Sequence, residues 1–181
     1  MIRILVPGCE LWDEKKNEFI YTKDQSLVLE HSLVSVSKWE SKWKIPFLGD
    51  QPKTREQTID YIRCMTITQN VDPTAYNRLT KKNIDTITSY IEDSQSATWF
   101  SETDKKGRRS TEQITSELIY YWMVAFQIPM ECQKWHFNRL LTLIRICSIK
   151  NQPKKKMSKR EIMRRNTALN EARRKKFNTK G

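Results

Sequence analysis

The sequence predicts a mainly α-helical protein with a small N-terminal antiparallel β-sheet, an α+β fold that ends in a basic helical arm. Three observations support this prediction. Apolar residues occupy alternate positions at the start of the chain, which is typical of strands. Through the middle of the chain they recur at helical spacing instead. After residue 150 the chain is strongly basic and has few apolar residues.

Residues 1–30 are expected to form the sheet. Ile2, Ile4 and Val6 are two residues apart and would share one face of a strand. The polar stretch Asp13–Glu18 suits a hairpin loop, because apolar segments lie on both sides of it. Three further segments are candidate strands: Leu11–Trp12, Phe19–Tyr21 and Leu27–Leu29.

Residues 31–152 are expected to form a helical body. Its first helix spans Ser32–Trp43 and ends before Pro46. Thr54 and Gln57 form a capping box, in which a hydroxyl accepts from one backbone amide and the side-chain amide reaches back to another. Further helices are indicated by the start signal Asp72-Pro73 and by the spacing of Ile84, Ile87 and Ile91.

The segment Leu118–Phe126 is apolar on all sides, so we expect a helix at the centre of the core. Ser110 and Gln113 form a capping box before it. After Pro129 a second apolar helix is expected to begin near Met130. Two helices joined across a proline are expected to pack as an antiparallel pair, which would be the main scaffold of the body.

Residues 153–181 are expected to form a basic helical arm. The net charge of the chain is +12, and residues 151–181 hold twelve Lys or Arg against two Glu. A capping box at Ser158 and Glu161 predicts a helix, but its apolar residues are too few to bury a full face. The candidate partner-binding residues are Lys154, Lys155, Lys156, Lys159, Arg160, Arg164, Arg165, Arg173 and Arg174.

Three interpretations of the arm remain open from its residues. An acidic protein surface would attract it, and a polyphosphate backbone would do so by counterion release. A solvated tail that only improves solubility is the third interpretation. Interleaved aromatic residues are missing apart from Phe177, which argues against a base-stacking platform.

Two tryptophans of the first helix are candidates for a protein-contact face. Trp39 and Trp43 are four residues apart and therefore share one side of the helix. Core packing is one interpretation of the pair. A protein-contact face is the other, because tryptophan is enriched at interface hot spots.

Motifs for catalysis, metal binding and cofactor binding are missing from the sequence. A zinc site needs three or four ligands, whereas His31 and His136 are the two histidines and the four cysteines lack C-x-x-C spacing. His136 lies in an apolar segment and is expected to be a core histidine. We therefore expect a binding protein with no catalytic residues, no metal and no cofactor.

The expected location is a reducing cytosol. The chain has cysteines but no signal peptide, and its longest apolar run, Leu118–Phe126, has nine residues. A membrane span needs about twenty. We therefore expect a soluble protein without a membrane partner.

Four segments of the chain resemble a group of small tailed-bacteriophage proteins encoded in the tail-morphogenesis region, and this group is similar to siphophage-type tail assembly chaperones. The resemblance covers Ile2 to Gly181 and brings no catalytic motif with it. The segments are LEHSLVSVSKWESKWKIPFL (Leu29–Leu48), KTREQTIDYIRCMT (Lys53–Thr66), QKWHFNRLLTLIRIC (Gln133–Cys147) and PKKKMSKREIMRRN (Pro153–Asn166).

The resemblance implies a non-enzymatic protein of the host bacterial cytoplasm. Such chaperones bind the long helical tape measure protein, keep it soluble and recruit tail tube subunits. Two alternatives remain: a nucleic-acid-binding phage protein that uses the basic arm, and a structural tail or neck connector kept in the virion. The sequence is also compatible with a homo-oligomer.

Overall fold

The computed structural model describes residues 1–14, 17–100, 113–152 and 158–178. The chain divides into two compact units, Met1–Ser148 and Ile149–Gly181. The first unit holds the sheet together with nearly all of the helical body, and the second holds the arm. The predicted fold class is confirmed, because the chain is mainly helical and its strands form small antiparallel pairs near the N-terminus.

The strands form two antiparallel pairs that follow one another along a single two-stranded ribbon. Val6 faces Gln25 and Glu10 faces Tyr21, so the register continues from the first strand pair into the second. The inner pair is β1 (Ile2–Val6) with β4 (Gln25–Leu29), and the outer pair is β2 (Glu10–Asp13) with β3 (Glu18–Tyr21).

Two segments of the chain, residues 8–9 and 22–24, approach each other closely where the inner and outer parts of the ribbon meet. The Gly8 N–H donates to Asp24 Oδ1 at 2.7 Å, and the Thr22 hydroxyl donates to the Cys9 carbonyl at 2.8 Å. A Cβ atom on Gly8 would lie 2.2 Å from the Thr22 carbonyl oxygen. Glycine is therefore the residue that this crossing accommodates.

The helices begin largely where their capping residues predict. Ser32, Thr54 and Ser158 each close a capping box, and Asp72 caps a 3-10 helix that starts with Pro73. The helices are α1 (Leu33–Trp43), α2 (Arg55–Met65), η1 (Pro73–Arg78), α3 (Lys81–Glu92), α4 (Ser116–Ala125), η3 (Met130–Lys134), α5 (Phe137–Asn151) and α6 (Lys159–Phe177).

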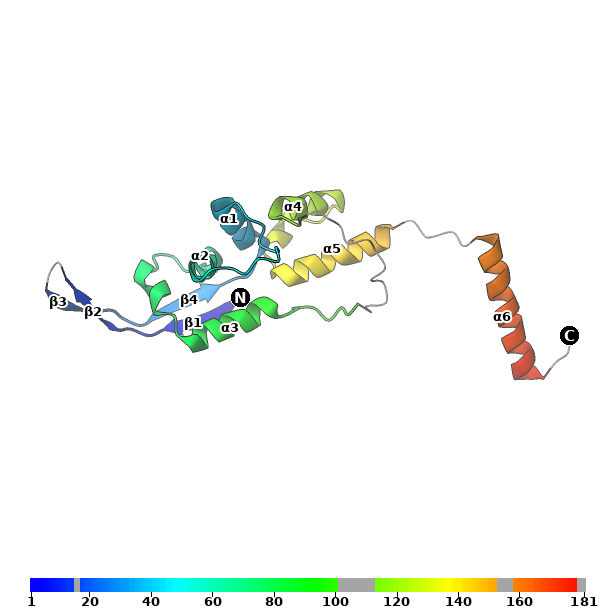
Figure 1. Cartoon of the computed structure of the whole chain (residues 1–181), viewed down its shortest axis with the longest axis horizontal. Helices are drawn as coiled ribbons and strands as arrows, with labels where there is room; N and C mark the ends of the chain where they lie inside the picture. The colour runs from blue at the N-terminus through cyan, green and yellow to red at the C-terminus, as the bar shows by residue number, and fades with distance from the viewer. Residues whose placement is uncertain (15–16, 101–112, 153–157, 179–181) are drawn as a thin grey trace. The chain divides into compact units, whose positions relative to one another are not determined.

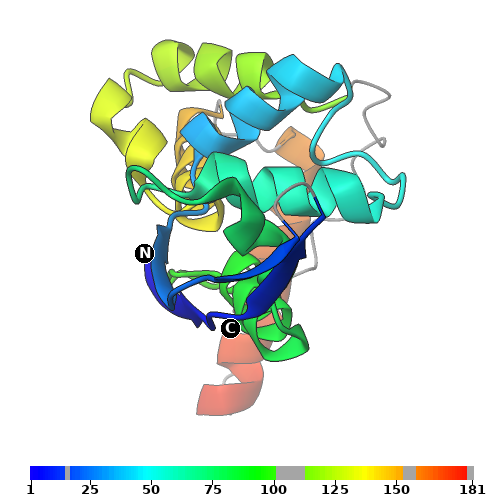
Figure 2. The same ribbon diagram turned by 90° about the vertical axis from the view of Figure 1, so that its left-hand side faces the viewer.

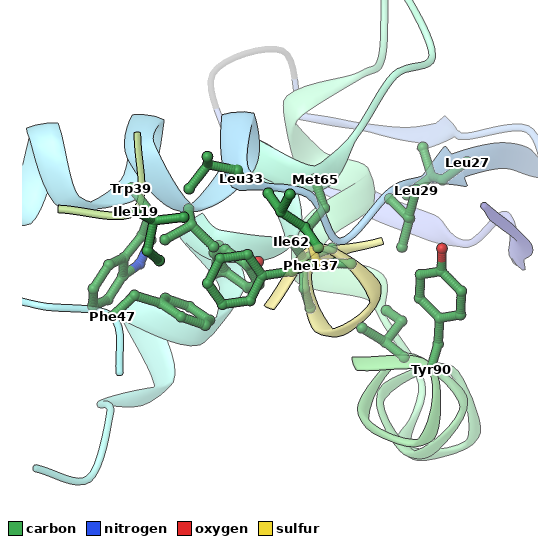
Figure 3. Close-up of a cluster of buried hydrophobic side chains, with 14 of the residues drawn as sticks. Leu27, Leu29, Leu33, Trp39, Phe47, Ile62, Met65, Tyr90, Ile119 and Phe137 are labelled. Carbon is green, nitrogen blue, oxygen red and sulfur yellow. The ribbon is translucent and has the colours of Figure 1, made fainter. Parts of the chain in front are cut away.

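Helices cover the inner strand pair and enclose the core. Helix α1 packs along α2, and α3 packs against β1 (Figures 1 and 2). The side chains of these elements meet in a single cluster, in which Phe137 of α5 lies beside Ile62 of α2 (Figure 3). The largest fully buried apolar side chains are Leu27, Leu29, Leu33, Trp39, Ile62, Met65, Ile119, Met123, Phe137 and Leu140.

The prediction that residues 118–126 form a central helix is wrong. Helix α4 buries one face, which includes Ile119 and Met123, and it exposes the opposite face to solvent. Its N-cap is Thr115, so the helix starts after Gln113. The other half of the expected capping box, Ser110, lies outside the described residues.

The prediction that the last two body helices form the main scaffold is also wrong. Helix α4 packs mainly on α1, and the most extensive packing between helices joins α1 to α2. The chain after Pro129 forms the 3-10 helix η3 and leaves helical geometry at Trp135. His136 instead bridges to Ser32, and the Phe137 N–H donates to the His31 carbonyl at 2.8 Å.

Candidate protein-binding surfaces

Helix α6 has complete local signals for a helix of its own. The Ser158 N–H donates to Glu161 Oε2 at 2.8 Å, and the Glu161 N–H donates to Ser158 Oγ at 3.2 Å. Asn178 ends the helix in the left-handed region at φ 50°. The basic residues of the last turn stabilise the helix by interacting with the negative end of its dipole.

The arm presents its charge on all sides. Every residue of α6 is exposed, and its sequence holds eight basic and two acidic residues, a net of +6. Of the predicted partner-binding residues, Lys154, Lys155 and Lys156 lie outside the described residues. The others all lie on α6: Lys159, Arg160, Arg164, Arg165, Arg173 and Arg174.

The two tryptophans of α1 have different positions. Trp39 is fully buried, its ring packs edge-on against Phe47 at 5.4 Å, and its indole N–H donates to the Gln57 carbonyl at 2.9 Å. Trp43 is half-buried, and its N–H donates to Asp60 Oδ2 at 2.9 Å. Trp39 therefore belongs to the core and offers no surface to a partner, because α2 and Phe47 cover it.

The two histidines meet inside the core, as expected for His136. Their ring centroids are 5.1 Å apart. His31 Nδ1 lies 2.5 Å from the Tyr61 hydroxyl, and His136 Nε2 lies 2.9 Å from the Tyr90 carbonyl oxygen. Burial, together with the electrostatic effect of the neighbouring His136, lowers the pKa of His31 to about 3. His31 is therefore neutral at physiological pH, and the pair joins the start of α1 to the start of α5.

A further buried carboxylate links the sheet to α3. Glu30 Oε1 accepts from the Tyr90 hydroxyl at 2.7 Å, and Glu30 Oε2 pairs with the amino group of Met1 at 2.8 Å. Burial and the contact with Glu30 raise the pKa of Tyr90. This cluster satisfies polar groups in the core, so its evident role is structural.

The described residues contain neither a cluster of metal ligands nor a helix that could span a membrane. Among those residues, no three His, Cys, Asp or Glu side chains gather closely enough to hold a metal ion. Within the same ranges, no helix has both the length and the apolar character to cross a bilayer.

Helices α4 and α5 carry exposed apolar residues that the sequence analysis did not predict to form a surface. Tyr121 and Val124 on the outer face of α4 are 65% and 68% exposed. A pocket of about 340 Å³ lies between α4 and α5, on a different face of α4 from these two side chains. Its lining residues are Trp122, Phe126, Leu141, Ile144, Arg145 and Ser148. The all-round apolar character of residues 118–126 was the available signal for this surface.

A second exposed apolar surface lies on the outer hairpin. Trp12 and Phe19 face each other across the strands, and their rings form an edge contact at 4.9 Å. Tyr21 lies on the same face, because residues two apart in a strand point to the same side. The three side chains are 50%, 58% and 72% exposed, respectively. We call this surface the aromatic hairpin face.

None of the protein-family models matches the chain, and no curated protein and no solved structure matches it either.

Proposed function

We propose that the protein is a non-enzymatic tail assembly chaperone of a tailed bacteriophage. In this role it binds the tape measure protein and tail tube subunits in the host bacterial cytoplasm. The observation that carries the proposal is the exposed apolar outer face of α4, together with the separate apolar pocket between α4 and α5. Exposed apolar surface on a folded protein is typical of a site for another protein surface.

The contacts around α4 make this surface well ordered before any partner binds. Buried Glu40 accepts from the Ser116 N–H at the start of α4 and from the Phe47 N–H, each at 2.7 Å. Ile119 and Met123 hold the inner face in the core. Tyr121 and Val124 are thereby directed outward. A preorganised apolar face suits an amphipathic client helix, which is how helix-in-groove recognition works.

The arm adds a charged element to the same function. Helix α6 is exposed along its whole length and carries a net charge of +6. Such a helix increases the rate of encounter with an acidic protein surface, and screening by salt weakens that attraction. The proposal assigns α6 to protein binding and α4 to the apolar contact with the client.

Co-expression with the tape measure protein from the same tail-morphogenesis region tests the proposal. We expect the wild-type chain to keep this client soluble and the double variant Tyr121→Lys/Val124→Lys to lose that effect. Leu5→Lys is the matched control, since Leu5 is 61% exposed on β1, away from α4. An insoluble client with the wild-type chain, or equal solubility with all three proteins, would refute the proposal.

The charge of α6 also supports a second candidate function, binding to nucleic acid. A helix with eight basic residues would release counterions from a duplex on binding, so the binding constant would fall steeply with salt. Titration of duplex DNA at several salt concentrations separates the two functions. Tight binding with a steep salt slope, abolished by deleting residues 154–181, would favour the nucleic-acid function over the chaperone.

Mass spectrometry of purified virions separates the chaperone from a structural connector. A chaperone acts during assembly, so the chain is expected in infected cells and at most in traces in virions. A stoichiometric amount in virions would favour the connector.

A further inference from the structure

The aromatic hairpin face has the character of a binding site without a described occupant. Within the described ranges, β2 and β3 pair with each other and with no third strand. The hairpin extends beyond β1 and β4, away from α1, α4 and α5 (Figure 1). Three large aromatic side chains on one side of an isolated hairpin cost solvation free energy unless a partner covers them.

The charge of the hairpin defines the partner. Residues 10–21 contain four acidic residues and two lysines, a net of −2. Glu10 faces Tyr21 across the strands, so its carboxylate lies on the aromatic hairpin face. A matching partner therefore offers aliphatic side chains for the rings and a basic side chain for the Glu10 carboxylate. Arginine suits both roles, because its guanidinium group stacks on aromatic rings.

The chain itself contains such a segment in α6. Ile162 and Leu169 are seven residues apart and lie on one side of the helix, about 10 Å from each other along its axis. Arg173 follows on the same side, one turn after Leu169. The aromatic hairpin face has a comparable length, since Tyr21 is about 7 Å along the strand from Phe19 and the rings extend beyond the backbone.

We infer that the aromatic hairpin face of one copy binds helix α6 of a second copy. The inference rests on the proposed role of α6 as a protein-binding arm and names its partner. Contacts of hairpin with hairpin, or of α6 with α6, would bring like charges together. The contact is therefore heterologous, joining different surfaces of the two copies, and it allows copies to follow one another head to tail.

The contact is small, so it is weak for two isolated copies. One hairpin face and two or three helical turns bury less than the roughly 1,200 Å² of a stable interface. Many copies on one long client would strengthen it, because each contact then forms at a high effective concentration. Salt weakens it through the paired charges.

Sedimentation velocity of the nuclease-treated full-length chain tests the inference. We expect self-association that grows with protein concentration and falls between about 50 mM and 500 mM salt. Trp12→Ala/Phe19→Ala removes one surface and Arg173→Glu/Arg174→Glu lowers the net charge of α6 from +6 to +2, so each variant alone is expected to stay monomeric. Trp99→Ala, which removes an exposed aromatic side chain that lies on neither surface, is the control that associates like the wild type.

Mixing the two variants gives the decisive result. The Trp12→Ala/Phe19→Ala chain keeps an intact α6 and the Arg173→Glu/Arg174→Glu chain keeps an intact hairpin, so the mixture is expected to form heterodimers. Glu10→Lys provides a second hairpin variant that retains the three rings and should also weaken association. Circular dichroism melts confirm that all variants are folded.

The inference is overturned if the wild type stays monomeric at all concentrations, or if the variants associate as it does. It is also overturned if the mixture stays monomeric. None of these outcomes would contradict the proposed binding of the client by α4. Loss of client solubility alongside normal self-association would instead count against the proposed function, so the two failures are distinguishable.

Discussion

At the scale of single residues, His31 ties the stability of the protein to pH. Its pKa is about 3 in the folded chain, whereas an ordinary histidine has a pKa of 6.5. Between these two pH values, His31 therefore binds a proton in the unfolded chain but not in the folded chain. The resulting stability is fully present above pH 6.5 and is lost as the pH falls toward 3.

We predict that the free energy of unfolding falls by about 2 kcal/mol between pH 7 and pH 5 because of this residue. Urea unfolding at a series of pH values measures the effect. The variant His31→Gln has no titrating group at this position, so its stability should change less over the same interval. Equal pH dependence in the two proteins would contradict the assignment.

Gly8 gives a second prediction at the residue scale. A Cβ atom there would overlap the Thr22 carbonyl oxygen at 2.2 Å, so Gly8→Ala should destabilise the protein by about 1–3 kcal/mol. Gly49→Ala is the matched control, since its Cβ would lie 3.3 Å from the Pro46 carbonyl oxygen. Chemical denaturation of both variants makes the comparison. A cost for Gly8→Ala no larger than that for Gly49→Ala would argue against the close crossing.

At the scale of elements, Glu40 couples α1 to the start of α4. The Glu40→Ala variant leaves the buried N–H groups of Phe47 and Ser116 without an acceptor, which should cost about 2–3 kcal/mol. Hydrogen exchange should then increase in α4 more than in α2, because α2 does not depend on this carboxylate. Uniform protection across the two helices would show that Glu40 does not hold α4 in place.

Local signals explain which elements were predictable from the sequence. Capping boxes depend on residues three apart, so the starts of α2 and α6 follow directly from Thr54 and Ser158. The exposed face of α4 depends on which distant elements cover the helix. No periodicity exists in an all-apolar segment to mark that face.

The break between η3 and α5 has the same kind of cause. It depends on the bridge from His136 to Ser32, two residues far apart in sequence. The candidate binding surfaces include both kinds of feature. The basic arm could be predicted from the charge of the sequence alone. The α4 face and the aromatic hairpin face could be identified only from the three-dimensional structure.

At the scale of the whole molecule, one unit holds the buried core and the other holds most of the net charge. The core lies within Met1–Ser148, and every residue of α6 is exposed. The residues up to 152 hold 21 basic and 19 acidic residues, because twelve of the 33 basic residues follow that point. The arm therefore contributes most of the net charge and little buried apolar area.

We predict that truncation after Gln152 changes the melting temperature of the body by no more than about 2 °C, because residues 158–178, the part of the deleted segment that is described, include no buried side chain. The same truncation should sharply lower the salt needed to elute the protein from a cation exchanger, since the net charge falls from +12 to +2. Calorimetry and ion-exchange elution measure the two effects on one protein. A large fall in melting temperature would mean that α6 stabilises the body, and the arm would then be part of the fold and unavailable as a free binding element.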